Sequence, residues 1–327
     1  MISRVADNCL WFGRYVERAE STARLLAVTR ELVFDAELPP EQCWHPLVIV
    51  SGEYPSFRAS LGAGAAVNGE AVQHYMAWSP DNQVSVRTSV RAAREIARTA
   101  RDTLSLEVWE EVNQLYLWLG GGDGEHAYAH AREEFYKHIR RHTQLCLGLV
   151  RSTMLHDDPM RFLWLGVMLE RVGQIARILD MHHHTLSGER PHQVVELSLW
   201  LSLLRACSGF EAFMRRNQGR ISRGAVASFL LFEPQFPRSL RYCLHSALSI
   251  MSQIWPSGDG VVARPLAALR SLCEWFDSQA ALLRTLSIHD LLTGVVDRTA
   301  SVCAQLHQEI LGPPRPRRIS QQMERMA

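Results

Sequence analysis

Residues 10–18 read Leu-Trp-Phe-Gly-Arg-Tyr-Val-Glu-Arg, and residues 163–171 read Leu-Trp-Leu-Gly-Val-Met-Leu-Glu-Arg. The similarity extends to residue 26 in the first stretch and to residue 179 in the second. Over 17 aligned positions at an offset of 153, 8 residues are identical, and they form the pattern W-x-G-x(3)-E-R-x(4)-A-R. Chance rarely repeats charged residues within apolar sequence, so we predict that the chain is internally duplicated.

Weaker repeats follow in the same order at similar offsets. They are Trp44-x-x-Leu47 with Trp200-x-x-Leu203, Ser51-Gly52 with Ser208-Gly209, Ser85-Val-Arg87 with Ser239-Leu-Arg241, and Gly148-x-Val150 with Gly294-x-Val296. We therefore predict two halves, residues 1–157 and 158–312, followed by a flexible basic Pro/Arg tail, residues 313–327. Two long copies indicate a pseudo-twofold helical bundle, since a solenoid needs more and shorter repeats.

The composition indicates a soluble cytoplasmic protein. Of the 327 residues, 47% are hydrophobic, which is enough for a large core. The seven cysteines have no CxxC spacing, which favours a reducing compartment. Apolar runs are too short to cross a membrane, and a net charge of +1 gives no bulk attraction to nucleic acid.

Apolar residues recur at helical spacing through nearly the whole chain, so we expect an all-α fold of about a dozen helices. The predicted helices are 5–34, 84–104, 106–119, 133–155, 160–186, 194–214, 240–255 and 282–311. Clusters of glycine and proline, such as Gly120–Gly124, predict loops between helices. Residues 47–50 are the one short stretch that could form a strand.

The repeated charges are predicted to meet in the interior. The second copy has Val167 and Gly173 where the first has Arg14 and Glu20, so we interpret these two charges as incidental. The second helix then reads as a central one whose charges need partners, because an isolated buried charge is costly. The predicted ion layer comprises Glu17, Arg18, Arg24, Glu170, Arg171 and Arg177.

A second basic feature is an arginine stripe. Its members share one helix face because their spacing is 4, 3, 4 and 3, and they are Arg87, Arg91, Arg94, Arg98 and Arg101. Like charges at this spacing each cost a few tenths of a kcal/mol, so anions should face the stripe. We expect them from Glu17, Glu170 and Asp7, or from a ligand or a partner protein.

Three roles remain open for these charges. The ion layer could be purely structural and fix the register of the two halves. The arginines could instead grip a carboxylate or phosphate in an accessory binding subunit. Thirdly, Glu17 or Glu170 could act as a general base in amide-bond chemistry, although neighbouring arginines oppose the raised pKa that this needs. We favour a protein that is non-catalytic on its own.

No metal site is predicted. His182, His183 and His184 are consecutive, so on a helix they point in different directions and cannot share one ion. His126 and His130 have i,i+4 spacing, but the sequence supplies no evident third ligand.

Several blocks together resemble the Alpha-E family, a bacterial all-helical family named for its Glu-Arg motif. They are Arg14-Tyr-Val-Glu17-Arg18, Ala93-Arg94-Glu95-x-Ala97-Arg98, Trp109-Glu110-x-x-Asn113, Gly166-x-x-x-Glu170-Arg171 and Phe236-Pro237-Arg238-Ser239. The resemblance spans residues 3 to about 311, in the family's order.

The resemblance implies partners more than a reaction. Alpha-E proteins accompany a circularly permuted ATP-grasp ligase and a transglutaminase-like peptidase, and sometimes a proteasome-like peptidase. We therefore expect an accessory subunit of an ATP-dependent peptide-modification system, with ATP and magnesium on the partner ligase and no cofactor of its own. Arg238 joins the arginine stripe as an expected anion- or partner-binding residue.

Overall fold

The computed structural model describes residues 3–35, 39–61, 67–185, 193–255, 263–282 and 287–308. Within these ranges the chain forms fifteen α-helices and no strand, which confirms the predicted all-α class. The first half contains α1 (Ser3–Asp35), α2 (Pro40–Val50), α3 (Tyr54–Leu61), α4 (Gly69–Ala77), α5 (Val86–Thr99), α6 (Leu106–Gly120), α7 (Gly122–His130) and α8 (Arg132–Thr153). The second contains α9 (Asp158–Thr185), α10 (Gln193–Ala206), α11 (Phe210–Arg216), α12 (Arg223–Phe232), α13 (Leu240–Ile254), α14 (Ala263–Ser278), the 3₁₀ helix η2 (Gln279–Leu282) and α15 (Ile288–Leu306).

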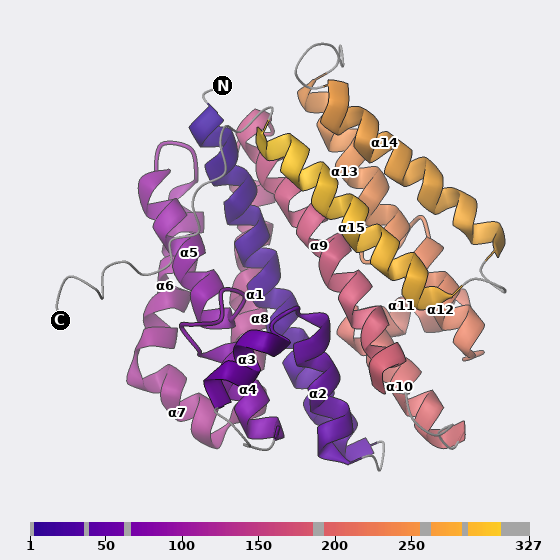
Figure 1. Cartoon of the computed structure of the whole chain (residues 1–327). Coiled ribbons are helices and arrows are strands. Elements are labelled where there is room, and N and C mark those ends of the chain that lie inside the picture. The colour runs from indigo at the N-terminus through magenta and orange to yellow at the C-terminus, as the bar shows by residue number, and fades with distance from the viewer. Residues whose placement is uncertain are drawn as a thin grey trace.

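The two long helices α1 and α9 lie side by side at the centre of the molecule (Figure 1). Helix α1 also packs against α5 and α8, and α9 packs against α13 and α15. Outside these, α6 contacts α5 and α8, and α14 contacts α13 and α15. Each central helix is therefore covered mainly by helices of its own half, while α10 also contacts α1 and α2 also contacts α9.

Two glycines bring α1 and α9 into direct backbone contact. The carbonyl of Leu163 lies so close to Gly13 that a Cβ there would overlap it, and the carbonyl of Leu10 stands in the same relation to Gly166. Each helix thus presents its glycine to the leucine of the other, and both the two glycines and the two leucines are pairs that the repeat aligns. These contacts fit the predicted duplication, which itself stays a prediction.

A second pair of aligned residues makes matching contacts. Ser85 caps α5 by accepting a hydrogen bond from the amide of Thr88, and Ser239 caps α13 by accepting one from Tyr242. Each hydroxyl also donates to a carbonyl six residues earlier, and each serine is fully buried. Two buried caps of this kind fix where α5 and α13 start against the central pair.

The structure corrects three local expectations. Residues 47–50 belong to α2 and form no strand. The predicted helix 194–214 is broken into α10 and α11, since Ser208 has φ 52° and cannot continue a helix. The predicted loop Gly120–Gly124 is reduced to Gly121, since α6 ends at Gly120 and α7 begins at Gly122. Gly124 makes this sharp turn possible because it packs directly on the carbonyl of Trp118.

Two other predictions fall partly or wholly outside the described residues, namely the tail 313–327 and the side chains of His182–His184. All seven cysteines are free thiols. Across the described helices, none combines the length and apolar character that a membrane crossing requires.

We predict that Gly166→Ala destabilises the fold by about 3 kcal/mol or more, because its methyl group would meet the backbone carbonyl of Leu10, which a side-chain rotation cannot relieve. Urea denaturation of the purified variant measures the loss. The matched control is Gly148→Ala on the exposed face of α8, where a methyl group meets nothing within 4 Å and should stabilise the helix slightly. Equal effects of the two substitutions would contradict the close contact of α1 and α9.

Candidate functional site

The repeated Glu-Arg pairs of α1 and α9 cross between the two helices. Arg171 donates two hydrogen bonds to Glu17, from Nε at 2.9 Å and from Nη2 at 2.7 Å. Arg18 donates to Glu170 in the same way, at 2.7 and 2.9 Å. Each carboxylate of one helix is therefore held by the planar fork of an arginine of the other, the strongest geometry for this ion pair.

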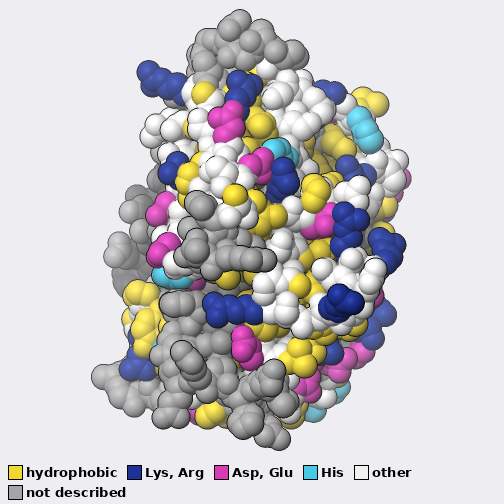
Figure 2. Space-filling view, turned by 90° about the vertical axis from the view of Figure 1, so that its right-hand side faces the viewer, with side chains coloured by type: hydrophobic (Ala, Val, Ile, Leu, Met, Phe, Trp, Pro, Cys, Tyr) yellow, Lys and Arg dark blue, Asp and Glu magenta, His cyan; other side chains and the backbone are white. Residues whose placement is uncertain are grey.

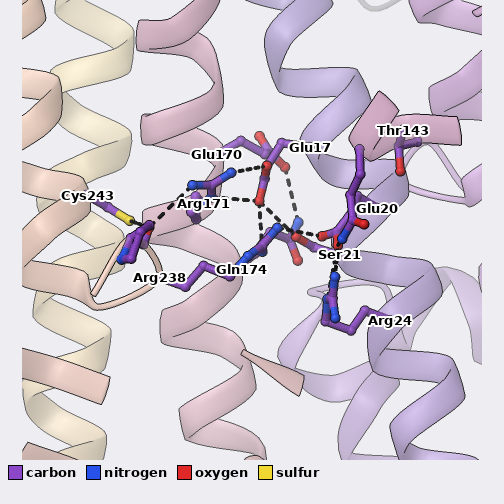
Figure 3. Close-up of polar contacts among 12 residues, drawn as sticks. Glu17, Glu20, Ser21, Arg24, Thr143, Glu170, Arg171, Gln174, Arg238 and Cys243 are labelled. Atoms are coloured by element: carbon purple, nitrogen blue, oxygen red, sulfur yellow. Dashed lines mark hydrogen bonds and ion pairs between the residues drawn. The ribbon is translucent and has the colours of Figure 1, made fainter. Parts of the chain in front are cut away.

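Each pair lies within a larger cluster, and Figure 3 shows these side chains between α1 and α9. The first cluster contains Glu17, Glu20, Arg24, Arg171 and Arg238. Arg238 reaches in from the start of α13 and donates to Glu17 at 3.1 Å and to Glu20 at 2.9 Å. Arg24 donates to Glu20 one helical turn away. The first cluster thus ties α13 to α1 as well as α1 to α9.

The second cluster surrounds Glu170. Besides the two hydrogen bonds from Arg18, Glu170 accepts one of 3.0 Å from Arg14 and one of 3.1 Å from Gln174. Arg177 lies near enough to interact electrostatically with Glu170 but forms no hydrogen bond or ion pair among the described residues. The six residues of the predicted ion layer therefore all belong to these two clusters, and Glu17, Glu170, Arg171 and Arg24 are buried.

The sequence interpretation missed essential members of both clusters. Arg14 and Glu20 were expected to be incidental charges, but each forms ion pairs inside a cluster. The prediction was wrong because the second copy has Val167 and Gly173 at these positions, which favoured an incidental role for the two charges. Arg238 was expected to bind an external anion, and it instead pairs with two buried carboxylates. Gln144, which donates to Glu20 from α8, gave no signal in the sequence.

The arginine stripe on α5 does not face the ion layer, contrary to one expectation. Arg98 pairs with Glu95 of its own helix at 3.0 Å, and Arg94 donates to Glu95 and to Asn113 of α6. Arg101 lies over the ring of Trp109, 4.5 Å from its centroid. The stripe is therefore a surface feature, and the described contacts include none with Glu17, Glu170 or Asp7.

Four of the five stripe arginines are exposed: Arg87, Arg91, Arg98 and Arg101. Arg94 is half-buried beside the ring of Tyr116. Aromatic rings of α6 attract guanidinium groups without neutralising their charge. The surface of α5 and α6 consequently keeps most of its positive charge available to a partner.

The clusters hold Glu20 and Glu170 in the ionised state. Burial by itself raises the pKa of Glu20, but Arg238 and Arg24 outweigh burial and lower it from 4.5 to about 2. At Glu170 burial is likewise outweighed by Arg18 and Arg14, and its pKa lies well below 4.5. A general base at neutral pH needs a pKa near 7, so this arrangement suits fixed ion pairs better than proton transfer.

A groove of about 270 Å³ opens beside the first cluster. Its lining combines apolar, basic, acidic and amide side chains: Ala212, Arg215, Arg216, Phe229, Glu233, Gln235, Phe236 and Pro237. The rings of Phe229 and Phe236 stack with centroids 4.8 Å apart. The carbonyl of Pro237 accepts a hydrogen bond of 3.3 Å from Arg171, so the ion layer also fixes one wall of this groove.

The histidines considered for metal binding are placed as follows. The rings of His126 and His130 stack, and Nδ1 of His130 lies 3.1 Å from the carbonyl oxygen of His126. A search of the described residues finds no group of three His, Cys, Asp or Glu side chains that could hold a metal ion.

Comparison with known proteins identifies related sequences. The Alpha-E model, described as a predicted alpha-helical domain with a conserved ER motif, matches residues 1–311. Uncharacterised proteins of Mycobacterium bovis and Mycobacterium tuberculosis are 31% identical to this chain over 262 residues, and one of a second M. tuberculosis strain is 30% identical. The match covers 74% of this chain but 28% of each relative, so the chain spans less than a third of their length. No solved structure matches significantly.

The lowered pKa of Glu20 predicts a specific acid sensitivity. A carboxylate whose pKa falls from 4.5 to about 2 on folding stabilises the protein above pH 4.5, and this stabilisation is lost as the pH falls towards 2. We expect Glu20→Gln to be less stable than the parent at pH 7 and to lose less stability between pH 4.5 and 2. Urea unfolding across this range tests the difference.

The control for this measurement is Glu274→Gln, which changes an exposed glutamate of α14 that has no ion pair among the described residues. Its stability should follow the parent at every pH. Parallel acid profiles for Glu20→Gln and the parent would contradict the role of Glu20 in the first cluster.

Proposed function

The chain belongs to the Alpha-E family, and we propose that it is a non-catalytic, cytoplasmic accessory subunit of an ATP-dependent peptide-modification system. Its main partner is a circularly permuted ATP-grasp ligase, which binds ATP and magnesium and forms the amide bond. A transglutaminase-like peptidase, and in some systems a proteasome-like peptidase, acts with them. The α5 arginine stripe docks on an acidic surface of the ligase.

One observation carries this proposal: the arginine stripe is exposed and mostly lacks acidic partners. Arg87, Arg91, Arg94 and Arg98 stand on one face of α5, and Arg101 lies in the turn that follows the end of this helix at Thr99. Among the described residues, Glu95 is the one carboxylate that forms ion pairs with them. Repulsion within such a stripe persists unless anions approach it. A partner with an acidic surface relieves the repulsion and gains fast, oriented association.

The aromatic side chains beside the stripe support protein docking. Arg101 and Arg94 lie over Trp109 and Tyr116 of α6, both of which are partly exposed. Tryptophan, tyrosine and arginine are the residue types most enriched among side chains that dominate binding at protein interfaces. Their combination on α5 and α6 favours a macromolecular partner over a small ion.

The ion layer argues for a positioning role in this protein. Glu170 is buried and accepts hydrogen bonds from two arginines and a glutamine, so it has little capacity left for a substrate proton. A catalytic role for Glu17 or Glu170, which the sequence left open, is therefore less favoured. The layer instead gives a rigid frame from which the stripe is presented.

The length of the mycobacterial relatives is consistent with a subunit that works beside other domains. In those proteins the matching region makes up 28% of the chain, so the helical unit is joined to extensive further sequence.

The proposal predicts that the double variant Arg91→Glu with Arg98→Glu binds the ATP-grasp ligase encoded in the same genome at least about tenfold more weakly, because the reversals turn attraction into repulsion. Isothermal titration of the two purified proteins measures the affinity, and the association should weaken with added salt.

The matched control reverses one exposed arginine on α14, Arg270→Glu. Helix α14 lies on the far side of the molecule from α5, on a face where basic, acidic and hydrophobic side chains are intermixed (Figures 1 and 2). This variant should bind like the parent. An unchanged affinity of the folded double variant, or no binding by the parent, would contradict the proposed docking surface.

A further inference from the structure

The two charge clusters differ by one carboxylate. In the first, Arg24 donates hydrogen bonds to Glu20, four residues before it. At the aligned positions of the second cluster, Arg177 follows Gly173. The second cluster therefore has Arg177 in place of Arg24 but lacks a glutamate equivalent to Glu20, to which Arg24 donates in the first cluster.

The position of Arg177 reflects this missing side chain. Nη1 of Arg177 lies 3.2 Å from the place that a Cβ on Gly173 would take. Apart from the backbone of α9 and the residues next to Gly173 in sequence, no other described residue has an atom within 4 Å of this Cβ position. The guanidinium of Arg177 thus lies over Gly173, and the place of the missing Cβ has no other close neighbour among the described residues.

The second cluster also carries surplus positive charge. Arg14, Arg18 and Arg177 surround the single carboxylate of Glu170, whose hydrogen bonds come from the first two of them and from Gln174. Burial, and then the charges of Arg18 and Arg14, lower the pKa of Arg177 despite the opposing effects of Glu170 and, more weakly, of Glu53. An additional anion beside Arg177 would stabilise the charged form of its guanidinium group.

The site is accessible from solvent. Gly173, Gln174 and Arg177 are all partly exposed, and the side chain of Arg14 is 20% exposed. A small ligand can reach Arg177 without separating α1 from α9.

We propose that the second cluster binds an external carboxylate over Gly173, where the first cluster has the side chain of Glu20. The ligand class is a monocarboxylate such as the free carboxyl group of an amino acid or the end of a peptide. Arg177 is its main contact, with Arg14 at the rim. This site goes beyond the proposed docking function and stands whether or not α5 binds a ligase.

A planar carboxylate fits better than a phosphate. The aligned position in the first cluster is filled by a carboxylate, and a guanidinium fork matches a carboxylate in shape and charge. A dianion would also demand more compensating hydrogen bonds than Arg177 and Arg14 can donate while Arg14 stays bound to Glu170.

The first test supplies the missing carboxylate within the chain. Gly173→Glu is compared with Gly173→Gln, because the two side chains have the same length and similar helix propensity. We expect Gly173→Glu to melt at a temperature several degrees higher, since only its side chain can form an ion pair with Arg177. Equal melting temperatures, or a lower one for Gly173→Glu, would overturn the proposed carboxylate position.

The second test adds the carboxylate from solution. N-acetylalanine is titrated into the intact parent protein by NMR, with the uncharged N-acetylalaninamide as the matched ligand control. We expect binding of the acid only, a loss of at least about tenfold in affinity for Arg177→Gln, and no binding by Gly173→Glu. Gly173→Ala should still bind N-acetylalanine, because a methyl group does not neutralise the charge of Arg177.

Three outcomes of the titration would contradict the inference: no binding of N-acetylalanine, equal binding of the acid and the amide, or unchanged affinity in Arg177→Gln. Inorganic phosphate is titrated in parallel. Saturable binding of phosphate without binding of N-acetylalanine would overturn the assignment of a carboxylate. None of these results depends on the α5 surface, so failure here and failure of the docking proposal can be told apart.

Discussion

The structure depends on two crossed carboxylate–guanidinium pairs that α1 and α9 exchange where their backbones touch. Glu17 and Glu170 are almost completely buried, and a buried carboxylate without a partner would cost several kcal/mol. Because the partner arginines come from the opposite helix, neither helix can slide or turn without breaking both pairs. Gly13 and Gly166 set the separation at which the pairs form. The remaining helices cover a central pair whose register is already fixed.

The same interactions extend from the centre towards the surface. Arg238 anchors the start of α13 to Glu17 and Glu20, and the carbonyl of Pro237 accepts a hydrogen bond from Arg171 beside the aromatic groove. On the other side of the layer, Arg177 is left without its own carboxylate. The layer therefore consists of buried ion pairs at its core and has more arginines than carboxylates around Glu170. This arrangement agrees better with binding and positioning than with proton transfer by the buried glutamates.

The sequence predicted the central features because repeated charges in an apolar helix have few explanations other than paired burial. It could not predict which residues complete the clusters. Arg238 lies more than 200 residues from its partners in the chain, and Glu20 looked dispensable because its counterpart is a glycine. Four of the five stripe arginines lie on α5, but Arg101 does not, because the helix ends at Thr99 and not at residue 104 as predicted. The neighbours of the stripe could not be predicted either, since the aromatic side chains of α6 meet α5 only through tertiary packing. The break between α10 and α11 at Ser208 could not be predicted either, because apolar residues recur at helical spacing across it.

The most direct test of the crossed layer is a double-mutant cycle on Glu17→Gln and Arg171→Met, with unfolding free energies measured in urea. The account predicts that each single substitution costs about 3–5 kcal/mol, because it removes the two-hydrogen-bond partner of a buried charge. The double variant should then cost less than the sum, by about 2 kcal/mol. Additive losses would show that these two side chains do not interact across α1 and α9, and would contradict the central claim.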